Sequence, residues 1–196
     1  MSQSTDRKEQ ILDTAEELLR KHGIAKTSVV DVARALDLSH AAVYKYFDSK
    51  IALQEAVAER WLHRISAPLA RISAREGDAV ERLRDWVHTL IRLKQKKVLD
   101  DSEMFATYHA LAETADGAVT RHVDELIAQL ERIVADGLAA GQLHATDARS
   151  AAWAVLNATA RFHHPHFVIQ YRGKTTDAEV DAVLNLLIAG LKAGAI

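Results

Sequence analysis

A short stretch before residue 50 carries side chains that could contact a nucleic-acid duplex. His40 and Tyr44 are four residues apart, and so are Ala41 and Lys45, so on a helix these two pairs share one face. Histidine and lysine can donate hydrogen bonds to bases or phosphates, and the small alanine lets a helix backbone come close to base edges. The hydroxyls of Tyr44 and Tyr46 can reach phosphate oxygens. This face therefore has the chemistry of a helix that lies in a major groove.

Two short helices are expected to position that face. Ser28 precedes Asp31 at the spacing of a capping box, which predicts a helix over about residues 28–36. Ser39 can cap a second helix over about residues 40–47. The side chains expected to point inward are all apolar, and they are Val29, Val32, Ala33, Leu36, Val43 and Phe47. Two short helices with a tight turn, after an amphipathic helix, match helix-turn-helix logic.

Lys50 follows this motif at the expected start of a longer helix. Free backbone amides and the helix dipole already favour an anion at such a position. A phosphate group is therefore a suitable partner for the Lys50 side chain.

Residues from about Glu9 to Leu53 carry a recognisable set of motifs. They are Ile11-Leu12-Asp13-Thr14-Ala15, Gly23, Thr27-Ser28-Val29, Asp31-Val32-Ala33 and Tyr44-Lys45-Tyr46-Phe47 followed by Ser49-Lys50. This quarter of the chain resembles the DNA-binding domain of the TetR (tetracycline-repressor-like) family. The resemblance implies an α-helical repressor, usually dimeric, with an inducer pocket in its C-terminal domain.

The resemblance also implies roles for individual residues. Ser28 and Tyr44 would contact phosphate, and Lys50 would anchor the DNA backbone. The residues implied to face bases are Val30, His40, Ala41 and Lys45. One departure is that family members commonly have glycine where Asp37 stands in the turn. Because aspartate tolerates left-handed backbone geometry better than most residues, we expect the turn to survive.

Composition and charge limit the other classes of protein. The 196 residues include no cysteine, so neither a disulfide framework nor a thiolate nucleophile is available. No apolar run approaches the roughly 20 residues of a membrane span, and the N-terminus has no apolar core of a secretory signal. Residues 1–50 hold eight basic and eight acidic side chains, so any DNA-binding surface must be a local patch. We expect a cytoplasmic protein that is not an enzyme and uses no cofactor.

Helical spacing continues along the rest of the chain, and strand signals are nearly absent. The expected fold is all-α, with about nine helices. Residues 1–50 would form a three-helix DNA-binding domain, and residues 51–196 a larger ligand-binding and dimerisation bundle. The helix that starts at Lys50 is expected to end or kink near Pro68, because proline lacks a backbone N–H. Asp147 can cap a later helix, which Pro165 should stop.

The last two expected helices, over about 147–163 and 177–192, are rich in alanine and leucine. In proteins that resemble this family, such helices pair with those of a second subunit in a four-helix bundle. Two recognition helices need half-sites about 34 Å apart for useful specificity, which favours a homodimer on a palindromic operator. The alternative is that both helices belong to the core of a single chain.

An effector pocket is implied by the same resemblance, in the interior of the C-terminal bundle. Ligand pockets combine apolar walls with a few polar tips. The candidate lining residues are Trp86, Leu90, Met104, Phe105, Tyr108, His109, His122 and Phe162. Taken singly, each is also compatible with an ordinary place in the core.

The histidines raise a second hypothesis, a helical metal-dependent enzyme. His109, His122 and the cluster His163–His166 could supply imidazole ligands to zinc or nickel. Adjacent histidines point apart on a helix, and Pro165 puts His166 in another element. Capping and polar packing therefore explain the cluster better, and no metal is expected. The chain also lacks a Gly-rich phosphate loop, a Gly-x-Ser-x-Gly elbow and a His-Glu-x-x-His helix.

Overall fold

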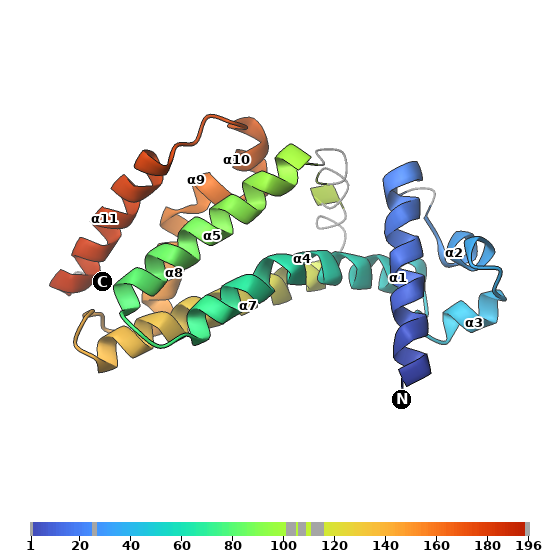
Figure 1. The fold of residues 1–196 in the computed structure, drawn as a ribbon, viewed down its shortest axis with the longest axis horizontal. Coiled ribbons are helices and arrows are strands. Elements are labelled where there is room, and N and C mark those ends of the chain that lie inside the picture. Colours follow the sequence, from blue (N-terminus) through green and yellow to red (C-terminus); the bar gives the residue numbers. More distant parts are fainter. Residues whose placement is uncertain (1, 25–26, 101–104, 106–108, 111–115, 195–196) are drawn as a thin grey trace. The chain divides into compact units, whose positions relative to one another are not determined.

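The computed structural model describes residues 2–24, 27–100, 105, 109–110 and 116–194, with only the backbone described at 2–5 and 116 (Figure 1). Within these residues every regular element is helical, which confirms the expected all-α class. The helices are α1 (Ser2–His22), α2 (Val29–Ala35), α3 (His40–Tyr44), α4 (Lys50–Ala74), α5 (Ala79–Asp100), α7 (Asp116–Ala139), α8 (Ala148–Ala158), α9 (Ala160–His163), α10 (Pro165–Gln170) and α11 (Asp177–Ala193).

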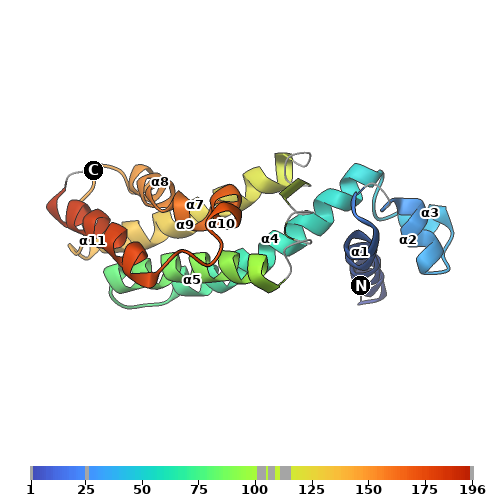
Figure 2. The same ribbon diagram turned by 90° about the horizontal axis from the view of Figure 1, so that it is seen from above.

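The chain divides into two compact units, and the first comprises residues 1–62 and 101–121. It holds α1, α2, α3 and the first half of α4, and α2 packs against both α1 and α3 (Figure 2). The buried residues of α1 recur at intervals of four, at Ile11, Ala15 and Leu19, and so form one stripe. Further core residues of this unit include Leu12, Val29, Val32, Ala33, Val43, Phe47, Leu53 and Val57.

The turn between α2 and α3 depends on a left-handed residue. Asp37 has a φ of 53°, in the region that favours glycine. The amide of Leu38 donates to the carbonyl of Ala33 at 2.9 Å and closes the end of α2. The turn therefore survives the aspartate, as expected.

The second unit comprises residues 63–100 and 122–196. In it α5 contacts α9, α10 and α11, and α8 contacts both α9 and α11 (Figure 1). The buried side-chain amide of Gln129 on α7 connects α5 with α4. Trp86 Nε1 of α5 donates to Gln129 Oε1 at 3.0 Å, and Gln129 Nε2 donates to the Ser66 carbonyl of α4 at 3.2 Å. Its buried apolar residues include Ile65, Leu69, Leu83, Leu90, Ile127, Leu130, Ile133, Val155, Leu184 and Leu191.

The sequence predicts an end or a kink at Pro68, and the helix does not end there, because α4 continues past it to Ala74. A proline inside a helix costs about 3 kcal/mol. Ile65 and Leu69 on either side are fully buried, and burying each such side chain contributes about 1.5–3 kcal/mol. Core burial therefore offsets the lost backbone hydrogen bond.

The expected start of a helix at Asp147 is confirmed, but the expected single helix over 147–163 is divided at Thr159 into α8 and α9. The carboxylate of Asp147 accepts the Ser150 amide at 2.7 Å and caps α8. The helical turn of α9 ends at His163, and Pro165 stands at the start of α10, where its missing N–H costs nothing. Among the described helices, none has the length and apolar character to cross a bilayer. The expected division of the chain at residue 50 coincides with the start of α4 and remains a prediction about its domains.

Candidate nucleic-acid interface and effector region

The residues predicted to face DNA lie around α3. His40, Ala41 and Tyr44 are exposed on this helix, and Tyr44 keeps 46% of its surface accessible. Lys45, also exposed, is the C-cap residue, so α3 is shorter than the expected helix over 40–47. The half-buried Tyr46 follows in a turn, and its amide donates to the Val43 carbonyl at 2.9 Å. The structure thus brings the expected polar and small side chains together on an exposed segment.

Local capping holds α3 and α2 in place. Ser39 Oγ accepts the Ala42 amide at 3.2 Å at the start of α3. At the start of α2, Ser28 Oγ accepts the Asp31 amide at 3.2 Å and donates its proton to Asp31 Oδ2 at 2.5 Å. The Ser28 hydroxyl and amide keep the pKa of the Asp31 carboxyl below its usual value. The Ser28 proton is therefore used inside the cap, and a phosphate contact by Ser28 would have to replace that bond.

The two other predicted DNA contacts sit at helix starts. Lys50 is the first residue of α4 and is half-buried, and Ser49 Oγ accepts the Ala52 amide at 3.0 Å beside it. Val30 is half-buried on α2. Both positions agree with the expected elements.

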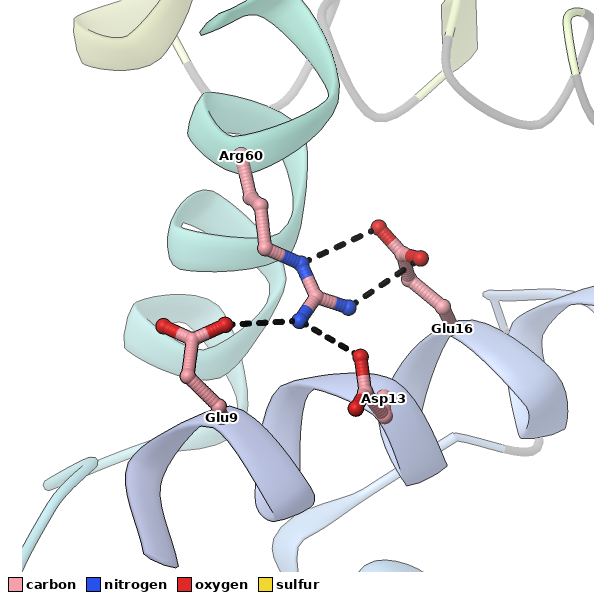
Figure 3. Close-up of polar contacts among 4 residues, drawn as sticks. All are labelled: Glu9, Asp13, Glu16 and Arg60. Carbon is pink, nitrogen blue, oxygen red and sulfur yellow. Dashed lines mark hydrogen bonds and ion pairs between the residues drawn. The ribbon is translucent and has the colours of Figure 1, made fainter. Parts of the chain in front are cut away.

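A guanidinium holds α1 against α4 within the first unit (Figure 3). Arg60 on α4 contacts three carboxylates of α1: Nη1 lies 3.2 Å from Glu9 and 2.8 Å from Asp13, and Nη2 lies 3.1 Å from Glu16. Arg60 Nε also donates to Glu16 Oε1 at 3.3 Å. Burial alone would lower the pKa of Arg60, but Glu16 and the other carboxylates raise it above its ordinary value.

Replacing Arg60 by methionine is expected to lower the free energy of unfolding by about 2 kcal/mol. The three carboxylates of α1 would then face each other without a counter-charge. The loss stays moderate because Glu9 and Asp13 are more than half exposed and therefore screened by water. Denaturant midpoints measure the change.

The control for this prediction is Arg121→Met, which removes an exposed ion pair between Arg121 and Glu59 in the same unit. That change is expected to cost less than about 0.5 kcal/mol. Equal losses in the two variants would show that the Arg60 cluster contributes no more than an exposed pair.

The predicted effector residues fall in both units. Trp86, Leu90, His122 and Phe162 are buried in the second unit. Phe105 and the half-buried His109 belong to the first unit, where Phe105 packs edge-on against Trp61 at 5.8 Å between ring centroids. Met104 and Tyr108 lie outside the described residues.

A hollow lies elsewhere on the second unit, between the end of α5 and the segment after α10. Its lining residues are Gln95, Val98, Leu99, Val168, Tyr171, Arg172, Gly173 and Thr175. None of the predicted effector residues is among them, so this hollow and the predicted set are separate places on the unit.

The histidines of the metal hypothesis do not all converge on one point. His163 is buried, and its Nε2 donates to the Leu156 carbonyl at 3.1 Å. His164 and His166 are exposed and each lies against Phe167. In the part of the chain that the structure describes, no three histidine or carboxylate side chains are placed to hold a metal ion.

Two polar clusters are absent from the sequence-based predictions. One is Arg60 with its three carboxylates. The other joins Lys94 on α5 to His122 on α7, with Nζ and Nε2 3.5 Å apart in the core of the second unit. The spacing of Glu9, Asp13 and Glu16 does indicate a single helix face, but it says nothing of what covers that face.

Family models match most of the chain. Residues 79–184 match the model of the tetracyclin repressor-like C-terminal domain, and residues 11–57 match that of bacterial regulatory proteins of the tetR family. The C-terminal match alone covers more than half of the chain. The chain therefore belongs to the family of tetracycline-repressor-like regulators.

Individual relatives agree with this assignment. The transcriptional regulator TtgR of Pseudomonas putida is 33% identical over 91 residues, which are 46% of this chain and 42% of the relative. The chain thus spans less than half the length of this curated relative. A structure from Rhodococcus sp. RHA1, described as a protein with unknown function, has a TM-score of 0.69 at 26% identity and covers 94% of this chain and 95% of its own.

A third comparison supports the fold alone. FadR of Bacillus subtilis, solved in complex with stearoyl-CoA, has a TM-score of 0.65 at 17% identity. The match covers 92% of this chain and 97% of FadR.

Proposed function

We propose that this chain is a ligand-responsive transcriptional repressor that binds a palindromic operator as a homodimer. The observation that carries the proposal is the exposed surface of α3, where His40, Ala41, Tyr44 and Lys45 lie together on a capped helix-turn-helix. In this role α3 enters the major groove, and the start of α4 lies at the phosphate backbone. A cytoplasmic site of action is part of the proposal, because the matching family model is of bacterial regulators, whose DNA lies in the cytoplasm.

Dimerisation through α8 and α11 is part of the proposal. Leu184, Ile188 and Leu191 of α11 are buried in the chain's own core. A second face of α11 carries Val183, Leu186, Leu187 and Gly190 at helical spacing, and Leu186 is 76% exposed. Such an apolar face on a helix is suited to a second copy of the chain.

The effector is a small molecule that binds the second unit. FadR, which shares the fold, was solved in complex with stearoyl-CoA, and that ligand belongs to FadR. Ligand releases DNA only if it binds the DNA-free state more tightly than the DNA-bound state. In the described part of the second unit, the candidates for contact with the effector are Trp86, Leu90, His122 and Phe162.

The test begins with selection of bound sequences from a genomic DNA pool and uses the selected operator in titrations. The double substitution Tyr44→Ala with Lys50→Ala is expected to weaken operator binding about 1,000-fold or more, because the homodimer loses four phosphate contacts and each costs about 1–1.5 kcal/mol. The dependence of affinity on salt should also become shallower, by about one unit of slope for each Lys50 lost. Fluorescence anisotropy at several salt concentrations measures both effects.

The matched control is Tyr171→Ala with Lys174→Ala, which removes the same two residue types from the second unit. Its operator affinity should stay within about twofold of the parent chain. An unaltered affinity in the Tyr44 and Lys50 variant would contradict the proposed interface.

A further inference from the structure

Three nitrogen-bearing side chains meet in the core of the second unit, each from a different helix. Lys94 of α5, His122 of α7 and His163 of α9 are 5%, 6% and 8% exposed. Lys94 Nζ lies 3.5 Å from His122 Nε2, and the electrostatic influence of Lys94 reaches both histidines. Among the described residues, no carboxylate forms an ion pair with Lys94. As far as the described residues go, the cluster therefore holds a buried cation without a counter-charge.

Hydrogen-bond donors outnumber acceptors in this cluster. His122 Nε2 accepts from the Lys94 ammonium, so the neutral ring carries its proton on Nδ1. That Nδ1 is buried and has no hydrogen-bond partner. The proton of His163 is donated to the Leu156 carbonyl. In the described part of the chain, two N–H groups of Lys94 and the Nδ1–H of His122 thus remain without an acceptor.

The charge of this cluster at neutral pH also favours an external acceptor. Burial lowers the pKa of Lys94 to about 8, so the ammonium form still predominates near pH 7. Burial, helped by the positive charge of Lys94, lowers the pKa of His122 to about 3, and burial lowers that of His163 to about 4. The cluster then carries one positive charge and two neutral imidazoles.

Apolar side chains lead up to the cluster along α5. Trp86, Leu90 and Lys94 follow each other at intervals of four, so they share one helix face, and the first two are fully buried. The indole of Trp86 is already satisfied by Gln129. A buried, unpaired charge at the end of an apolar face is typical of a ligand site.

We propose that the effector is a carboxylic acid with an apolar body, and that Lys94 and the Nδ1–H of His122 bind its carboxylate. This inference rests on the proposed function and gives the chemical class of its effector. The carboxylate supplies the acceptors that the cluster lacks, and the apolar body takes the place beside Trp86 and Leu90.

The test uses the full chain and four matched pairs of probes: octanoate, decanoate, benzoate and phenylacetate, each with its neutral amide. Isothermal titration calorimetry is expected to show binding of at least one carboxylate, with its amide at least tenfold weaker. Lys94→Met should weaken that carboxylate at least 30-fold. Lys96→Met, at an exposed position of the same helix, should leave it within twofold.

His122 is tested by two variants. His122→Asn retains an N–H donor near the position of Nδ1 and should bind the carboxylate more tightly than His122→Leu, which has none. The inference would be overturned by equal affinity for acid and amide, or by equal affinity in the Lys94→Met variant and the parent chain. It would also be overturned if none of the four carboxylates bound.

DNA binding is measured separately, without any carboxylate. A parent chain that binds the acid but no DNA would contradict the proposed function, while the carboxylate-binding site itself would still be supported. A chain that binds its operator but does not distinguish acid from amide would overturn only the inference about the effector.

Discussion

Replacing Val43 by aspartate is expected to unfold the first unit at room temperature. Val43 is fully buried, although Ala41 and Tyr44 on the same helix are exposed. An isolated carboxylate in such a core loses its hydration without gaining a partner, and the substitution also removes a packed side chain. We expect a loss of about 4 kcal/mol or more, which is most of the stability of a small domain.

The matched control is Ala41→Asp, two residues earlier on the same helix at an exposed position. Its melting temperature should be close to that of the parent chain, since a surface substitution changes stability by about 0.5 kcal/mol or less. Circular dichroism during heating measures both variants. A melting curve of Val43→Asp that superposes on that of the parent chain would contradict the buried placement of this side chain.

The second unit should become more stable as pH rises above about 8, because the buried Lys94 side chain then loses its charge. Its pKa is about 8 in the folded chain and 10.5 as a free side chain, so the unfolded chain binds the proton more tightly. The free energy of unfolding therefore rises as pH increases from about 8 to 10.5. Below pH 8 the buried charge of Lys94 lowers it by the full amount. A shift of this size corresponds to about 3 kcal/mol.

Lys94→Met should gain a similar amount at pH 7, because methionine fills comparable space without a charge. The difference in unfolding free energy between this variant and the parent chain should vanish near pH 10.5, which separates Lys94 from other groups that titrate there. His122 and His163 act only below about pH 6.5, outside this window. Urea titrations at several pH values measure the difference, and a Lys94→Met variant less stable than the parent chain at pH 7 would refute the prediction.

Local features of the fold were predictable because their physics is local. Ser28, Ser39 and Asp147 each cap a helix as expected, since a cap needs only a side-chain oxygen and an amide three residues later. A helical turn also ends just before Pro165, as expected, because proline lacks the backbone N–H that would continue it. The exposed residues of α3 follow from the spacing of their buried neighbours.

Features that depend on distant neighbours were not predictable from the sequence. The passage of α4 through Pro68 depends on what buries Ile65 and Leu69. Lys94 has the sequence context of a surface lysine, and only the packing of α7 and α9 against α5 makes it a buried cation. Periodicity identifies a helix face, whereas the partner of that face comes from elsewhere in the chain.

The contact between Arg60 and α1 sets a lower limit on the length of any fragment that keeps α1 intact. A polypeptide excised at residue 57, where the N-terminal family match stops, would retain Glu9, Asp13 and Glu16 but not the guanidinium that neutralises them. Like charges on successive turns repel, so α1 would fray in such a polypeptide. Gene fusions that include this DNA-binding domain should therefore carry the coding sequence at least through Leu62.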